Sequence, residues 1–115
     1  MASVDLNDIA TNGIQTLQGS IDLLNQAKVQ PGADIGGIVK QIEDLEEQQE
    51  ALRDMALGTI QATDANKQAI AAVSAAAASL NVEAANITDV VTALANAAKV
   101  INAAASLVTA LTPFA

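Results

Sequence analysis

The stretch Ser74-Ala-Ala-Ala-Ala-Ser79 decides the fold class of this chain. Alanine has the highest helix propensity of all residues, and its small side chain lets two helix axes approach more closely than leucine does. The run lies in a longer segment, residues 68–115, that has three charged residues and no His, Cys, Trp or Tyr. We therefore predict an all-α protein whose alanine-rich helices pack closely and antiparallel.

A first amphipathic helix is predicted over about residues 5–28. Asp5 offers a capping side chain, and Asp8 places a carboxylate in the first turn, where the helix dipole favours negative charge. Pro31-Gly32 then forces a turn. Apolar residues recur at helical spacing, at Leu6, Ala10, Ile14, Leu17, Ile21 and Leu24. This spacing predicts a helix that buries one face.

A second helix is predicted over about residues 34–80, with Asp34 as its cap and its apolar residues near a heptad register. The alternative is a break near residues 58–64, where Gly58 would end one helix and Thr63 or Asp64 would cap the next. The continuous helix is favoured because this region contains no proline and no cluster of turn residues.

The last helix is predicted over about residues 83–111, with Asn86 as its cap. One of its stripes is polar but nearly uncharged, which suits a face held against another helix, where side chains bond across the contact. The candidate helix-contact seam consists of Ala76, Leu80, Ile87, Val90, Leu94, Ala98, Ile101, Ala105 and Val108. Residues 1–115 are thus predicted to form one domain, a helical hairpin or three-helix bundle with one long central helix and an alanine-rich C-terminal helix.

An acidic cluster is formed by Glu43, Glu46, Glu47, Glu50 and Asp54. Catalytic carboxylates need a pocket, whereas these residues lie on a helical segment that we expect to be solvated. The chain has no histidine, so the Glu-x-x-His motif of helical metal sites is absent. Like charges three or four residues apart repel, so we expect a pH-sensitive element that changes assembly as carboxylates become protonated. No catalytic, cofactor-binding or metal-binding residue is predicted, and no cofactor.

The overall composition narrows the classes of partner. The net charge is −8 with five scattered basic residues, which argues against binding to nucleic acid or to an anionic membrane. Lys99 lies in the middle of the apolar residues 90–111, so we predict a buried soluble helix there, with a membrane hairpin as the alternative. The first residues show no secretory signal pattern, and we expect a cytoplasmic protein.

A family resemblance covers about residues 50–85. Met55-Ala-Leu-Gly58, followed by Gln61-Ala-Thr63 and a helix rich in alanine, asparagine and glutamine, resembles the small structural proteins of R bodies. That resemblance implies a non-enzymatic subunit that polymerises into a ribbon in the bacterial cytoplasm. It also implies that the acidic cluster is a candidate pH sensor.

The function predicted from the sequence is structural. Phe114 is the only aromatic residue, so a monomer would bury little apolar area, and association with a second copy would add to it. We predict a non-enzymatic protein that self-assembles through its alanine-rich helices as a homo-oligomer, a polymer or a pH-responsive ribbon. The alternative is a small helical adaptor or chaperone that binds an apolar helix of a larger client, such as an exported toxin.

Overall fold

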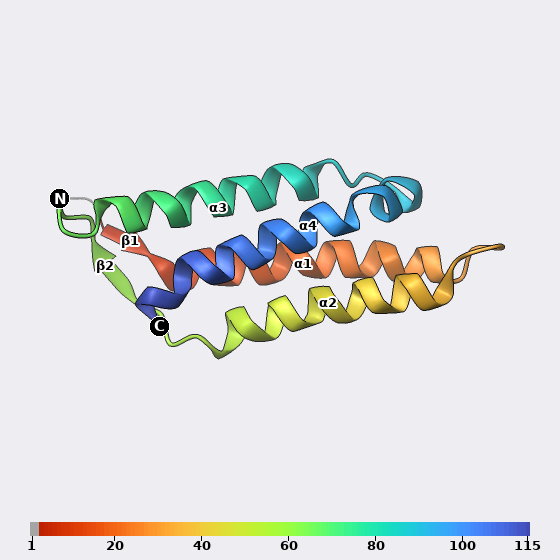
Figure 1. Ribbon diagram of the computed structural model, residues 1–115, viewed down its shortest axis with the longest axis horizontal. Helices are drawn as coiled ribbons and strands as arrows, with labels where there is room; N and C mark the ends of the chain where they lie inside the picture. The colour runs from red at the N-terminus through yellow and green to blue at the C-terminus, as the bar shows by residue number, and fades with distance from the viewer. Residues whose placement is uncertain (1–2) are drawn as a thin grey trace.

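Four helices run alternately up and down in the computed structural model, which describes residues 3–115 (Figure 1). The helices are α1 (Leu6–Lys28), α2 (Ile35–Asp54), α3 (Lys67–Ala85) and α4 (Val90–Leu111), followed by a 3-10 turn, η1 (Thr112–Phe114). Two short strands, β1 (Ser3–Asp5) and β2 (Thr59–Gln61), pair antiparallel with Val4 opposite Ile60. The chain is therefore an all-α bundle with one two-stranded ribbon at its end.

The bundle is flattened, with principal extents of 53 × 24 × 16 Å. α1 and α4 form an antiparallel inner pair, and each of them packs against the other three helices. α2 and α3 flank this pair on opposite sides (Figure 1). The two consecutive hairpins, α1–α2 and α3–α4, are thus joined by the contacts of α4 with α1 and α2 and, to a smaller extent, by that of α1 with α3.

Gly13 lies at the centre of the bundle, where leucines from the three other helices converge. A Cβ atom at this position would lie 3.2 Å from Leu52 of α2, 3.2 Å from Leu107 of α4 and 3.8 Å from Leu80 of α3. The three leucines are almost fully buried. The missing side chain therefore provides the space in which all four helices meet.

The start of α2 shows why glycine occupies position 37, three residues after the cap. The Asp34 carboxylate accepts a hydrogen bond of 3.2 Å from the backbone N–H of Gly37. A Cβ atom on Gly37 would lie 2.5 Å from that carboxylate. Glycine at this position thus lets the cap approach the backbone closely, although glycine weakens a helix elsewhere.

The prediction of one long helix over residues 34–80 is wrong, because α2 ends at Asp54 and α3 begins only at Lys67. Gly58 accepts a hydrogen bond from the backbone N–H of Leu6, and β2 then pairs with β1. The Asn66 side chain bonds the backbone of Thr63 and of Gln61. Tertiary and side-chain hydrogen bonds thus replace the helical ones, and the bundle has four helices rather than three.

The start of the last helix also differs from the prediction. Asn86 ends α3, and Asp89 is the cap of α4. The Asp89 carboxylate accepts from the backbone N–H of Thr92 at 2.8 Å, and the Thr92 hydroxyl accepts from the backbone N–H of Asp89 at 2.9 Å. This reciprocal capping box satisfies two backbone donors at the start of α4.

A buried amide fixes the register of α1 against α2. Gln49 is 5% exposed, and its amide Nε2 donates to the carbonyl oxygen of Ile14 at 2.9 Å and to the Gln18 side chain at 3.2 Å. A shift of either helix would leave these polar groups buried without partners, which is costly.

The packing at Gly13 can be tested with a matched glycine on the same helix. Gly13→Leu forces a large side chain among three buried leucines, so we expect the free energy of unfolding to fall by about 1–3 kcal/mol or more. Gly19 is exposed, and a Cβ atom there would have no neighbour within 4 Å, so Gly19→Leu should be neutral or stabilising by up to about 1 kcal/mol. Urea denaturation monitored by circular dichroism measures the free energy of unfolding of both variants. Equal changes for Gly13→Leu and Gly19→Leu would contradict this packing.

Candidate protein-association surface

The charges of the chain are divided unequally between the two hairpins. Eleven acidic and three basic residues precede Lys67, which gives that part a net charge of −8. From Lys67 onward, two acidic and two basic residues cancel. The whole net charge therefore belongs to the part that contains α1 and α2, and the α3–α4 hairpin is neutral.

The outward sides of α3 and α4 form a surface that we call the neutral face. It contains the exposed residues Ala71, Ala72, Ser74, Ala75, Ala78, Ser79 and Val82 on α3, and Val91, Leu94, Ala95, Ala98, Asn102, Ser106 and Thr109 on α4. None of these residues is charged, and Lys99 is the one charged residue of α4. A solvated helix face normally has many Lys and Glu side chains, so this composition favours a contact surface.

The predicted seam lies beside the core rather than in it. Of its nine residues, Leu80 is buried, Leu94 and Ala98 are exposed, and the other six are half-buried. The face of α4 that is buried within the bundle consists of Ala93, Ala97, Val100, Ala103, Ala104, Leu107 and Leu111. Sequence reasoning missed this face because four of its seven members are alanines, which the larger Ile, Leu and Val residues of the seam outweighed.

The uncharged polar stripe of α4 bonds its own helix. The Asn96 amide donates to the carbonyl of Thr92, and the hydroxyls of Ser106 and Thr109 donate to the carbonyls four residues earlier. The prediction that these groups bond across a helix contact is not met within this chain. With their hydrogen bonds satisfied locally, the hydroxyl-bearing side chains offer a partner mainly small, apolar surface.

The large exposed apolar residues gather at one end of the bundle, here called the apolar end. Among residues 3–115 these are Val29, Ile35, Val82, Val91 and Leu94. They lie at or within about one helical turn of the α1–α2 and α3–α4 connections, which share the end of the bundle opposite to the strand pair (Figure 1). Val29 is 75% exposed and Val91 is 73% exposed, so the single chain leaves these apolar side chains uncovered.

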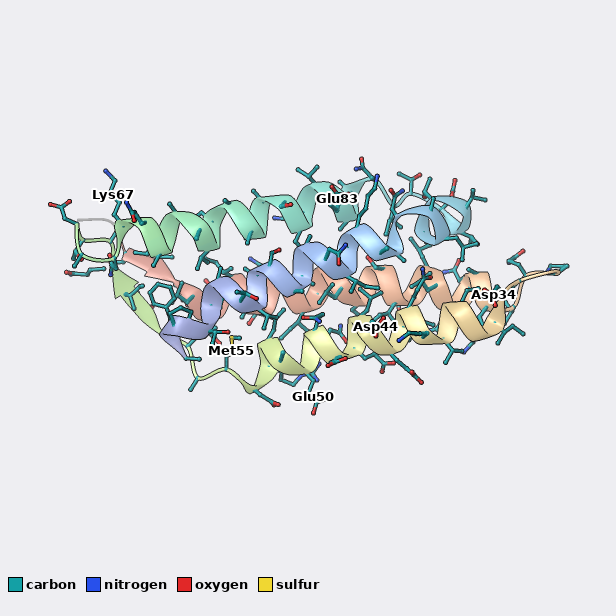
Figure 2. The ribbon with its side chains drawn as sticks, in the orientation of Figure 1. Asp34, Asp44, Glu50, Met55, Lys67 and Glu83 are labelled. Carbon is teal, nitrogen blue, oxygen red and sulfur yellow. The ribbon has the colours of Figure 1, made fainter. Side chains whose placement is uncertain are left out.

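A shallow groove runs between α3 and α4 on the neutral face. It is lined by Ser79, Glu83, Lys99, Asn102, Ala103 and Ser106. Glu83 lies near the C-terminal end of α3 (Figure 2) and is half-buried; its Oε2 atom is buried without a hydrogen-bond partner among the described residues. Glu83 and Lys99 are thus a pair of opposite charges in an otherwise uncharged groove.

The acidic cluster lies on the outer side of α2. All five members are exposed, and Figure 2 shows Glu50 on this side of the bundle. Glu43 and Glu46 also line a groove between α1 and α2, opposite Lys28. Among residues 3–115 the one ion pair joins Lys40 to Asp44 at 3.8 Å, and no three acidic side chains come together as metal ligands. In the single chain, the acidic cluster is therefore a solvated surface whose carboxylates repel one another.

One helix within residues 3–115, Val90–Phe114, has the length and mean hydropathy, 1.4, that a membrane span requires. Only 33% of its most apolar window is buried in the bundle. α4 thus presents more apolar surface than its own chain covers. That this helix does not span a membrane stays a prediction.

No protein family, curated protein or solved structure matches this chain. The resemblance to R-body subunits therefore stays a prediction. The function has to be argued from the surfaces described above.

The cap of α4 gives a pH-dependent prediction. Hydrogen bonds from the backbone N–H and the hydroxyl of Thr92 hold the pKa of Asp89 below its usual range. A lowered pKa in the folded state means that the cap stabilises fully above the unfolded value, about 3.9, and that this stability is lost as the pH falls through the folded pKa. Asp89→Asn keeps a capping side chain without the titration. At pH 6 we expect the variant to melt at a lower temperature than the wild-type chain, and we expect this difference to shrink as the pH falls to 2. A difference that stays constant over this range would contradict the role of the Asp89 carboxylate as a charged cap.

Proposed function

We propose that this chain is a non-enzymatic structural subunit that self-assembles through the neutral face. The observation that carries the proposal is the confinement of all net charge to the part before Lys67, while α3 and α4 expose alanine, serine and valine. Charged groups are depleted from the centres of protein–protein interfaces. Apart from Glu83 and Lys99 in its groove, the neutral face has this property.

Electrostatics selects which faces of two copies meet. Contact through the α1–α2 hairpins would bring two surfaces of strong negative charge within a Debye length, about 8 Å at physiological salt. Contact through the α3–α4 hairpins adds no net repulsion, because their charges cancel. The acidic side then points outward and keeps the assembly soluble.

The size of the side chains supports a close contact. Alanine and serine on the neutral face let helices of two copies approach to a short interaxial distance, so that many atoms pack with little loss of side-chain entropy. The exposed Val82, Val91 and Leu94 add apolar area, at about 25 cal/mol per Å² buried. Association would thus add buried apolar area to a core of aliphatic side chains in which the one aromatic residue, Phe114, is only half-buried.

A ribbon or filament needs two different contacts on each subunit, because a single twofold contact closes into a dimer. The neutral face offers one contact and the apolar end offers another. We infer that the two together build a polymer, as the resemblance to R-body subunits implies. The exposed acidic cluster then opposes growth at neutral pH and permits it on acidification.

The alternative function is that of an adaptor or chaperone for an apolar helix of a larger client. The exposed Val82, Val91 and Leu94 favour it, because an apolar helix of a client can bury its apolar face against them. The two functions differ in solution. A structural subunit forms large ordered particles by itself, whereas an adaptor stays small until its client is present.

Charge placed on the neutral face tests the proposal. Ala75→Glu and Ala98→Glu put a carboxylate on exposed positions of α3 and α4, so we expect assembly to weaken by about tenfold or more while the fold is kept. Light scattering coupled to size-exclusion chromatography and negative-stain imaging measure assembly.

Gln15→Glu is the matched control, since Gln15 is exposed on α1, away from the neutral face. It adds the same charge and should leave assembly nearly unchanged. Equal effects of all three substitutions would show that general repulsion, not the neutral face, governs assembly. Particles that form only with added phospholipid vesicles would instead assign the face to a membrane.

Acidification tests the role of the acidic cluster. The sequence isoelectric point is about 4.1, so lowering the pH from 7 towards 4 removes the net charge that keeps copies apart, and we expect larger particles. Replacing Glu43, Glu46, Glu47 and Glu50 by Gln halves the formal net charge from −8 to −4 and should promote assembly already at pH 7. Constant particle size and shape across this pH range would overturn the role.

A further inference from the structure

The two opposite charges of the α3–α4 groove, Glu83 and Lys99, form no ion pair among residues 3–115. Glu83 and Lys99 line the same groove from facing helices, yet the one ion pair among residues 3–115 is Lys40–Asp44. Glu83 is half-buried, and its Oε2 atom, which its own chain covers, has no hydrogen-bond partner among residues 3–115. From Gln68 to Ala115, the one further charge is Asp89, which caps α4.

We propose that a second copy of this chain docks over the groove about a twofold axis, so that Glu83 of each copy pairs with Lys99 of the other. The inference rests on the proposed self-assembly through the neutral face and adds how two copies are oriented in that contact. The occupant is a second copy because one groove offers both charges, and a twofold contact requires a self-complementary surface.

The antiparallel arrangement of α3 and α4 fits such an axis. A twofold axis along the groove, parallel to the helices, places α3 of one copy over α4 of the other. α3 and α4 run in opposite directions (Figure 1). The helices that would meet across the contact are therefore antiparallel. Each Glu83 then faces a Lys99, since the two residues lie on opposite walls of one groove.

The surroundings of the pair permit close approach. Ser79, Asn102, Ala103 and Ser106 complete the lining of the groove, and none of them is larger than asparagine. Alternative orientations are disfavoured by charge: sliding one copy along the groove leaves both pairs unmatched, and turning it onto the α1–α2 side brings it to the acidic surface. The two reciprocal pairs therefore set the register of the contact.

Charge reversal tests the pairing. We expect Glu83→Lys alone and Lys99→Glu alone to weaken self-association by about tenfold or more, because each homodimer would then contain like charges across the contact. An equimolar mixture of the two variants should regain association as a mixed species, and the double variant should regain it as a homodimer. Analytical ultracentrifugation with one variant fluorescently labelled resolves these species.

Glu83→Lys also separates pairing from general repulsion. The substitution reduces the negative charge of the chain, so repulsion alone predicts stronger association, whereas the pairing predicts weaker association. Circular dichroism melts of each variant verify that the fold is kept, and Glu83→Gln, which removes the charge without reversing it, should have an intermediate effect.

The outcomes distinguish this inference from the function on which it rests. A wild-type chain that stays monomeric at all concentrations overturns both. A wild-type chain that assembles equally well with either charge reversed, or that is rescued in the double variant but not in the mixture, overturns the twofold pairing alone. The second result would place the ion pair within one chain.

Discussion

The close approach of α1 to α4 at Gly13 is the constraint on which the rest of the bundle depends. Leu52, Leu80 and Leu107 occupy the space that a side chain at this position would fill, so one point of contact involves all four helices. The buried face of α4 consists largely of alanines, and these small side chains let α4 lie close to α1, α2 and α3. The flat shape of the molecule follows, because α2 and α3 are left on opposite flanks of the inner pair.

The sequence predicts the parts of this fold that local signals determine. The first helix matches α1 closely, since Asp5, the apolar spacing and Pro31-Gly32 all act within a few residues of the helix ends. The break between α2 and α3 is only the alternative prediction because its cause lies elsewhere: β2 pairs with β1, more than fifty residues earlier in the chain. A single-sequence pattern contains no sign of that long-range pairing.

The surface likewise has features that the sequence predicts and features that only the packing of the helices determines. The sequence directly shows that the α3–α4 region is nearly uncharged, but it does not show which of these residues face outward. Apolar periodicity indicates the stripe through Leu94 and Ala98, and these two residues are exposed, whereas the alanines at 93, 97 and 104 are buried. In an alanine-rich helix two faces have similar hydrophobicity, so neighbouring helices, rather than composition, decide which one is covered. The gathering of exposed valines and leucine at one end likewise appears only once the two helix connections are seen to coincide.

The strand pair has a consequence for the order in which the chain becomes organised. β1 joins residues 3–5 to residues 59–61, and its register depends on a partner that is synthesised after the whole α1–α2 hairpin. During synthesis that acidic hairpin therefore leaves the ribosome with its first strand unpaired, and the ribbon closes only when the segment leading into α3 has emerged. The α3–α4 hairpin is consequently completed last, after the acidic α1–α2 hairpin has left the ribosome.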